Sequence, residues 1–238
     1  SIGGFDPVAA EDVQRFAEDS MRVFIPMITG LDVVHGYYTT FPIPLGSSSS
    51  WNLGLLEESA RVAAREATAF GINWTFAPMV DISRDPRWGR VAEGAGEDPY
   101  LGSLVAQAMV RGYQGDDLSD GETIMACTKH LVLYGASEAG RDYNTVSMDD
   151  VTAYNYFLPT YKAAFDAGAG SGMTSFNVVN GVPTTGNRKV MTELLRDQWG
   201  FDGFIVSDAN AIAEMIEHGV GGPQEVAEMA INAGTDMD

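Results

Sequence analysis

The sequence predicts an α/β fold, a (β/α)8 TIM-type barrel with about seven of its eight units present. Two observations carry this prediction: short apolar runs alternate with longer helical patterns, and polar side chains follow most of the apolar runs. An apolar fraction of 45% over 238 residues is sufficient for one buried core and argues against disorder. We therefore expect a single domain over residues 1–238.

The apolar runs have the length of β-strands, and the segments between them are long enough for helices. The 27 glycines of the chain fit the tight turns that repeated strand–loop–helix units require. The predicted strands are Ile2–Phe5, Ile25–Leu31, Ile72–Val80, Ile124–Thr128, Gly172–Phe176, Gly203–Val206 and Gly234–Met237.

The helical segments start and stop at residues that favour helix boundaries. Asp6 can cap a helix that begins at Pro7 and carries Val13, Phe16 and Ala17 on one face. Strands and helices that alternate in this way imply a parallel sheet with right-handed crossovers. The other predicted helices are Leu53–Phe70 between Asn52 and Gly71, a helix with Ser147 and Asp150 as its capping box, Arg188–Trp199 before Gly200, and Pro223–Ala233 before Gly234.

A doubly wound open sheet and a closed barrel both satisfy this alternation, and the polar residues at strand ends favour the barrel. Barrel enzymes place functional groups at the ends of many strands, whereas an open sheet concentrates them near one switch point. No G-x-G-x-x-G follows the first strand. The eighth unit is expected to be absent after Asp238, which leaves two open edges for another segment or a second copy to fill. The strand-end residues are Asp32, Asp81, Lys129 with His130, Asn177 and Asp208.

The charge of the chain excludes several classes of partner. A formal net charge of −19, with 14 basic residues against 33 acidic ones, offers no positive stripe for a nucleic acid or an anionic membrane surface. A neutral ligand such as a sugar meets no such barrier. Cys127 is the only cysteine, so the chain can form no internal disulfide, and no apolar stretch has the length of a membrane span.

Several motifs, in order along nearly the whole chain, resemble those of family 3 glycoside hydrolases of the bacterial β-glucosidase type. They are Gly-Leu-Asp-Val-Val-His-Gly at 30–36, Ala-Pro-Met-Val-Asp at 77–81, Asp-Pro-Arg-Trp-Gly-Arg at 85–90, Glu-Asp-Pro at 97–99, Lys-His at 129–130 and Gly-Phe-Ile-Val-Ser-Asp at 203–208. The resemblance implies the N-terminal catalytic barrel of such an enzyme, incomplete at its C-terminal end and without the later domains.

The resemblance implies that Asp208 is the catalytic nucleophile. A retaining glycosidase needs a carboxylate below the anomeric carbon and a second carboxyl group roughly 5 Å away as acid/base. From its position alone, Asp208 could equally be the N-cap of a helix over Ala209–His218, and both readings remain open.

The resemblance also implies a set of sugar-binding residues. Asp32 would accept bonds from two sugar hydroxyls, and Arg90 and Lys129 would donate to sugar oxygens. The structural alternatives are a turn residue for Asp32 and an ion pair at the barrel mouth for Arg90 and Lys129. His130 would donate to a hydroxyl, although a lone histidine is often a satisfied core residue. The full set is Asp32, Arg90, Lys129, His130, Phe176 and Asp142, the last expected to orient the Lys–His pair.

Some residues of this chain differ from the family pattern, so the substrate specificity of those family members cannot be assumed for it. Phe176 stands where many members have Tyr, which implies one hydrogen bond fewer to Asp208, and Ala209 stands where many plant and fungal members have Trp. The loop 132–143 has no His, which excludes the branch that hydrolyses N-acetylglucosaminides. The acid/base is then expected from a later domain, so the chain alone should hydrolyse glycosides poorly. We interpret His35 and Arg87 as structural supports, and His218 as a residue that favours the end of its helix.

The sequence thus predicts part of a retaining, exo-acting β-glycosidase of β-glucosidase type, acting on β-linked glucosides or short oligosaccharides without metal or cofactor. Many relatives are periplasmic or secreted, which favours that location. One alternative is a non-catalytic sugar-binding module that self-assembles through its open edges. Another is an unrelated barrel, such as an aldolase, with Lys129 as a Schiff-base lysine.

Overall fold

The parallel strands hydrogen-bond to one another in the order in which they occur in the chain. The computed structural model describes residues 7–238. A parallel ladder that never reverses its order is typical of a barrel and not of a doubly wound sheet, so the predicted architecture is confirmed. Its strands are β1 (Gly30–Leu31), β2 (Trp74–Thr75), β3 (Cys127–Leu131), β4 (Ser171–Thr174) and β7 (Phe204–Val206). Parallel bridges extend the ladder, pairing Trp74 with Met125, Met79 with Lys129, and Val206 with Met237.

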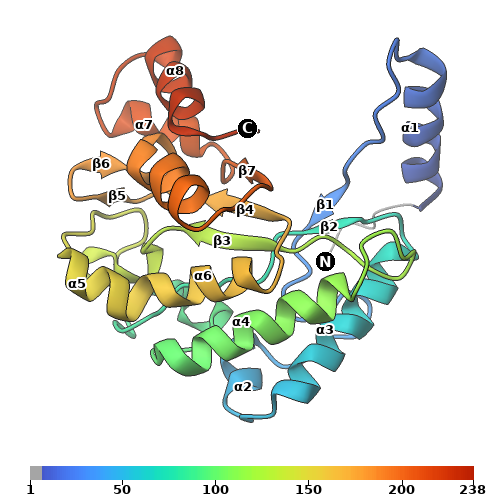
Figure 1. Ribbon diagram of the computed structural model, residues 1–238, viewed down its shortest axis with the longest axis horizontal. Helices are drawn as coiled ribbons and strands as arrows, with labels where there is room; N and C mark the ends of the chain where they lie inside the picture. Colours follow the sequence, from blue (N-terminus) through green and yellow to red (C-terminus); the bar gives the residue numbers. More distant parts are fainter. Residues whose placement is uncertain (1–6) are drawn as a thin grey trace.

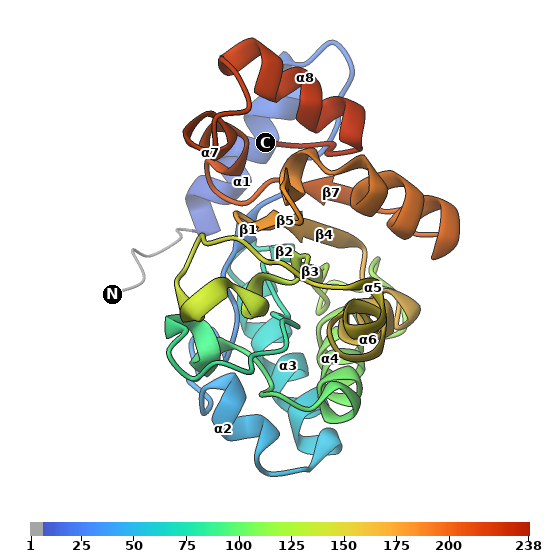
Figure 2. The same ribbon diagram turned by 90° about the vertical axis from the view of Figure 1, so that its left-hand side faces the viewer.

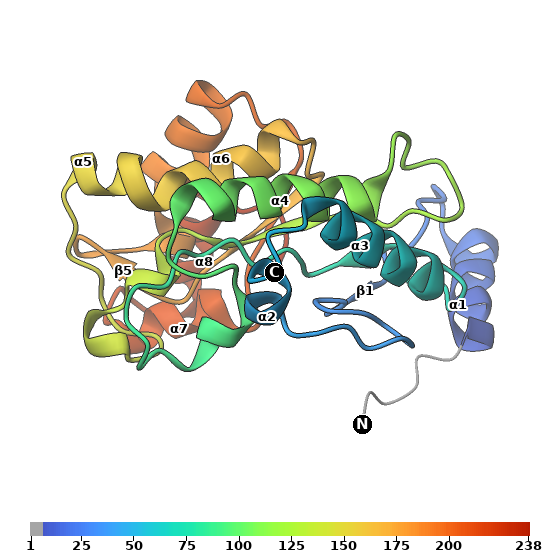
Figure 3. The ribbon, with the colours of Figure 1, turned by 90° about the horizontal axis from the view of Figure 1, so that it is seen from below.

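Helices surround this ladder on its outer side. Figures 1 and 2 show α7 and α8 above the strands and α3 and α4 below them, and Figure 3 shows α4 running beside α3 and α6. The α-helices are α1 (Pro7–Ser20), α2 (Pro44–Ser48), α3 (Leu53–Thr68), α4 (Pro99–Gln114), α5 (Asp150–Thr152), α6 (Leu158–Asp166), α7 (Ala211–Glu217) and α8 (Pro223–Ala233). Tighter or wider turns form η1 (Gly89–Glu93), η2 (Tyr134–Ala136), η3 (Glu138–Gly140), η4 (Ala153–Phe157), η5 (Thr184–Gly186) and η6 (Lys189–Gln198).

The long helices begin and pack as their residues dictate. The Asn52 side chain accepts from the Leu55 amide at 3.2 Å, which confirms the predicted start of α3. A Cβ on Gly112 of α4 would lie 2.4 Å from the Glu57 carbonyl oxygen and 2.5 Å from the Ala60 Cβ, so glycine is needed where α3 and α4 touch. Close contact between these helices lets both pack on the same face of the ladder.

Several predicted boundaries were wrong, and one prediction lies outside the described residues. Most predicted strands are shorter than expected, and Ile25–Leu31 is a strand only at Gly30–Leu31. The helix expected from Ser147 is capped by Asp149, whose side chain accepts from the Thr152 amide at 2.9 Å. The predicted strand Ile2–Phe5 and the cap Asp6 lie before residue 7. A short antiparallel hairpin, β5 (Val178–Val179) and β6 (Val182–Pro183), follows β4.

The N-terminal helix differs from the rest of the chain. Figure 1 shows α1 standing away from the strands and the other helices. Of the apolar face expected at Val13, Phe16 and Ala17, only Ala17 is buried, while Phe16 is 72% exposed. The segment from Val23 to Ile28 that leads into β1 also carries exposed apolar side chains. This end of the chain therefore contributes little to the core.

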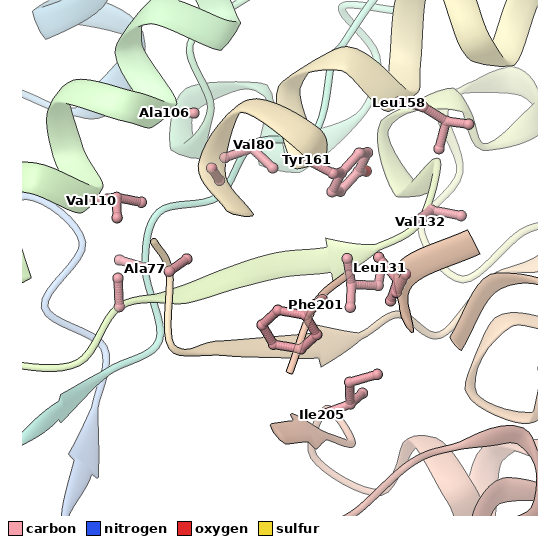
Figure 4. Packing of buried hydrophobic residues seen from close by; sticks show 14 of the residues in the cluster. Ala77, Val80, Ala106, Val110, Leu131, Val132, Leu158, Tyr161, Phe201 and Ile205 are labelled. Carbon is pink, nitrogen blue, oxygen red and sulfur yellow. The ribbon is translucent and has the colours of Figure 1, made fainter. Parts of the chain in front are cut away.

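The main core lies between the ladder and the helices α3, α4 and α6. Leu131 of β3 and Ile205 of β7 are completely buried, and Tyr161 of α6 packs into the same cluster (Figure 4). Residues of neighbouring parallel strands are therefore held rigidly, and the side chains that follow those strands share one edge of the ladder.

Candidate active site

Charged residues from four parts of the chain meet at that edge of the ladder. Asp32 follows β1, Lys129 and His130 belong to β3, and Asp208 follows β7. Arg90 joins them from η1, the turn that follows the β2 region. These predicted site residues are therefore brought together, although they lie far apart in the sequence.

Arg90 is held by a carboxylate that the sequence reasoning missed. Arg90 Nε lies 2.8 Å from Glu93 Oε2, and Arg90 Nη2 lies 2.9 Å from Glu93 Oε1. Both residues belong to η1, a 3₁₀ turn, in which side chains three positions apart lie above one another. The two-point contact fixes the plane of the guanidinium group, and the same group lies over the Tyr134 ring at 5.5 Å.

Lys129 connects this pair to Asp32. Its Nζ lies 2.8 Å from Asp32 Oδ1 and 3.2 Å from Glu93 Oε1, and its side chain is 5% exposed. A buried ammonium group needs such partners. The structural reading of Arg90 and Lys129, an ion-pair network at the strand ends, thus agrees with the structure, and the Asp32 carboxylate of this network stays exposed to solvent.

Glu93 remains ionised in this network. Burial would raise its pKa, but the hydrogen bonds from Arg90 and the positive charges of Lys129 and Arg90 lower the pKa of Glu93 to about 2. Burial would likewise lower the pKa of Arg90, and the bonds and charge of Glu93 raise it instead. Glu93 and Arg90 therefore keep their charges at neutral pH.

Asp208 lies at the end of β7 beside His130. Its Oδ1 accepts from the Ala209 amide at 2.7 Å, and its Oδ2 lies 3.4 Å from His130 Nε2. Its side chain is 16% exposed, so the carboxylate is recessed and still reachable. Helix α7 begins at Ala211 with Asn210 in the capping position, so the alternative in which Asp208 caps a helix from Ala209 is not found.

His130 is enclosed by charged and polar partners. Its side chain is 1% exposed, its Nδ1 lies 2.9 Å from Asp81 Oδ2, and its Nε2 lies 3.0 Å from Arg90 Nη2. Burial lowers the pKa of His130; the hydrogen bond and charge of Asp81 oppose this, and the charges of Arg90 and Lys129 lower it further. His130 is therefore neutral at pH 7.

The role expected for Asp142 in orienting the Lys–His pair was wrong. Asp142 accepts from the Trp88 indole at 2.9 Å, and it is Asp81 that bonds His130. A contact between residues 54 positions apart leaves no local signal in the sequence. Asp81 was recognised as a polar residue at a strand end and as the last residue of the motif at 77–81, but its bond to His130 was not expected.

Phe176 lies in an aromatic group next to the charged residues. Its ring centroid lies 4.7 Å from that of Tyr143 and 6.0 Å from that of Tyr134. Burial raises the pKa of Tyr143, and the charges of Asp142 and Asp208 raise it further. The sequence reasoning did not single out either tyrosine, because exposed and buried aromatics look alike in a loop.

The residues interpreted as supports make local contacts. His35 Nδ1 lies 3.0 Å from the Phe41 carbonyl oxygen, and Arg87 pairs with Asp85 at 2.6 Å. His218 ends α7 and its Nε2 lies 3.2 Å from the Phe176 carbonyl oxygen. Within residues 7–238, no His, Cys, Asp and Glu side chains are grouped so as to hold a metal ion, and no helix there is long and apolar enough to cross a membrane.

Comparison with known proteins gives one consistent family. The sequence model described as the glycosyl hydrolase family 3 N terminal domain matches residues 6–238. A periplasmic beta-glucosidase of Salmonella typhimurium is 45% identical over 98% of this chain, which spans 31% of that protein. A putative beta-xylosidase of Formosa agariphila is 35% identical over 98% of this chain and 32% of its own length.

Solved structures agree with this assignment. A beta-glucosidase from Listeria innocua, solved as a D270A mutant in complex with laminaribiose, superposes with a TM-score of 0.96 at 45% identity, covering 99% of this chain and 33% of that one. The chain thus spans about a third of the length of its relatives. With the fold, the site and both comparisons in agreement, the chain belongs to glycosyl hydrolase family 3 and corresponds to its N-terminal domain.

Proposed function

We propose that the chain forms the nucleophile and sugar-binding part of a retaining, exo-acting β-glucosidase that acts on terminal, non-reducing β-D-glucosyl residues. The observation that carries the proposal is the recessed Asp208 carboxylate, 3.4 Å from His130 and at the same edge as the Asp32–Lys129–Glu93–Arg90 network. The Asp208 carboxylate faces the neutral His130 ring, whereas the carboxylates of Asp32 and Glu93 pair with Lys129 and Arg90.

In the first step, an Asp208 carboxylate oxygen attacks the anomeric carbon and forms an ester with the sugar. The bond from that carbon to the leaving oxygen breaks, and the leaving oxygen takes a proton from the acid/base. In the second step, water gives a proton to the same acid/base and attacks the anomeric carbon, which frees Asp208 and retains the configuration. We expect the acid/base to come from outside this chain, as the family resemblance implies.

The other residues would bind and orient the terminal sugar. Asp32, at the exposed end of the network, can accept from two hydroxyls, while Arg90 and Lys129 can donate to oxygens and hold charge near the nucleophile. Phe176 offers an aromatic wall, and Asp142 accepts from the indole of Trp88, which packs in the same cluster as Phe176. Glucose and laminaribiose are bound by the Listeria innocua relative, which supports β-linked glucosides and short oligosaccharides as substrates. The named location of the Salmonella typhimurium relative supports a periplasmic or secreted location.

The test is covalent trapping of the complete protein. A 2-fluoro glucosyl donor with an activated leaving group needs little help from an acid, and its ester with Asp208 should be found by peptide mass spectrometry. Asp208→Asn should give no adduct and reduce turnover by about 10⁴-fold or more, whereas Asp202→Asn, an exposed residue at the other end of β7, should label normally. Glucose binding without an adduct in folded protein would favour the non-catalytic, self-assembling module instead, and borohydride trapping at Lys129 would favour the aldolase-like alternative.

A further inference from the structure

Beneath His130 lies a carboxyl group that the proposed reaction does not use. The Asp81 side chain is completely buried, and its Oδ2 accepts from the His130 amide at 2.9 Å and lies 2.9 Å from His130 Nδ1. Its Oδ1 accepts from the Tyr161 hydroxyl. A buried carboxylate is stable only when its oxygens are hydrogen-bonded in this way. The donors at Oδ1 and Oδ2 therefore decide how strongly the Asp81 charge acts on His130.

Tyr161 reaches Asp81 from the outer layer of the fold. Figure 4 shows the Tyr161 ring directed from α6 into the space between Val80 and Leu158. Its hydroxyl donates to Asp81 and accepts from the Leu133 amide at 3.0 Å. Burial and then the charge of Asp81 raise the pKa of Tyr161 well above its ordinary value, so the hydroxyl keeps its proton and remains a donor.

This chain of bonds selects one tautomer of His130. Because an ionised Asp81 can only accept, Nδ1 must carry the proton of the neutral ring, and the lone pair lies on Nε2. Arg90 Nη2, at 3.0 Å, donates to that lone pair. Asp208 Oδ2 lies 3.4 Å from the same nitrogen and receives no proton from it.

We propose that Tyr161 is a positioning residue that acts through Asp81 to keep the His130 proton on Nδ1, so that Nε2 accepts from Arg90 and does not donate to Asp208. A proton donated to Asp208 would stabilise the carboxylate before it attacks and would weaken it as a nucleophile. A sugar hydroxyl could meet Nε2 only as a donor that replaces Arg90, the reverse of the role expected from the sequence. The effect on Asp208 rests on the proposed function, whereas the tautomer of His130 does not.

Tyr161 can be changed without removing any group that touches the imidazole ring. Loss of its hydroxyl leaves Asp81 with one donor fewer, so more of the Asp81 charge acts on His130 and the pKa of His130 rises. A protonated ring carries a second N–H, at Nε2, which points at Asp208. The charged and titratable groups that face His130 are Asp81, Arg90, Glu93, Lys129, Tyr134 and Asp208, and all of them remain in this variant.

The experiment is a ¹⁵N NMR titration of the complete protein labelled at its histidines, with the His130 signals assigned by their loss in His130→Gln. The wild-type ring should show a protonated Nδ1 and an unprotonated Nε2 at neutral pH. In Tyr161→Phe the His130 titration should move upward by about one pH unit, the effect of one lost hydrogen bond. The matched control is Tyr113→Phe, which removes a buried hydroxyl bonded to the Val33 carbonyl at 2.6 Å in the same core and should leave the titration unchanged.

A kinetic measurement separates this inference from the proposed function. As the pH is lowered, protonation of His130 should slow labelling by the 2-fluoro donor. In Tyr161→Phe this decline should begin at a higher pH than in the wild type, by the same shift that NMR measures, and in Tyr113→Phe it should not move. A proton on Nε2 in the wild type overturns the inference, even if Tyr161→Phe does not fold. Equal His130 titrations in folded wild type and Tyr161→Phe overturn it as well. A shifted titration in a protein that never labels would support the tautomer and refute Asp208 as nucleophile.

Discussion

The two ends of the site are held in different ways. On the central strand β3, the side chains of Lys129 and His130 are 5% and 1% exposed and are bonded to partners from several elements. After the edge strand β1, the Asp32 side chain is 61% exposed, and its one described bond comes from Lys129. Lys129 and His130 are therefore fixed by the fold, whereas the Asp32 carboxylate is open to solvent.

The largest loss of stability is expected at the buried end, in Asp81→Asn. Asparagine has one acceptor oxygen where aspartate has two, so it can accept from His130 or from Tyr161 but not from both, and its NH₂ group then faces a donor on the other side. Breaking a buried charged network costs about 3 kcal/mol or more of the free energy of unfolding. Urea denaturation at pH 7 measures it, with the exposed Asp197→Asn on η6 as control. Equal urea midpoints for Asp81→Asn and Asp197→Asn would show that the buried end of the site does not stabilise the fold more than the exposed surface does.

An intermediate effect, with a defined pH dependence, is expected in Glu93→Gln. The folded pKa of Glu93 is about 2, below the ordinary value of 4.5, so its contribution is complete above pH 4.5 and is lost as the pH falls toward 2. Wild type should exceed the variant by on the order of 3 kcal/mol at pH 7, with the difference shrinking through this window. Denaturation at several pH values tests it, and the exposed Glu97→Gln should show no comparable trend.

The smallest effect on stability is expected at the exposed end, in Asp32→Asn. An ion pair with one exposed partner contributes less than about 1 kcal/mol. Glucose affinity should nevertheless fall roughly tenfold to a hundredfold, because charge-assisted bonds to hydroxyls are lost. Calorimetric titration of the complete protein with glucose measures this. A large loss of stability with unchanged affinity would show that Asp32 builds the site instead of binding the ligand.

The parts of this site that could be predicted from the sequence are those with a local signal. Asn52 and Gly234 mark helix ends by their own chemistry, and apolar runs that end in a polar residue indicated the positions of Asp32, Lys129 and Asp208. Strand lengths were overestimated, because the backbone of an apolar run can bond a side chain instead of another strand, as Met27 before Gly30 does with Gln14.

The parts that could not be predicted depend on contacts between distant elements or on an unusual turn. Glu93 pairs with Arg90 because η1 is a 3₁₀ turn, and the surrounding residues give no signal that predicts a 3₁₀ turn there. Tyr161 on α6 meets Asp81 across 80 positions, and Asp142 meets Trp88 instead of the Lys–His pair. Such contacts follow only from how the helices pack on the ladder.

The neutral state of His130 has a consequence for the kind of molecule that the site prefers. In the part of the chain that the structure describes, the carboxyl groups of Asp32, Asp81 and Glu93 near Asp208 bond two permanent cations, Arg90 and Lys129, and the neutral His130. Because the imidazole is uncharged, the carboxylates outnumber the cations and the net charge around Asp208 is negative. The resulting electric field acts at short range, where little water screens it. Such a field favours a ring that bears positive charge over a neutral one of the same shape. The proposed reaction passes through an oxocarbenium-like ring of that kind, so the packing that keeps His130 uncharged would stabilise the positive charge of that short-lived species.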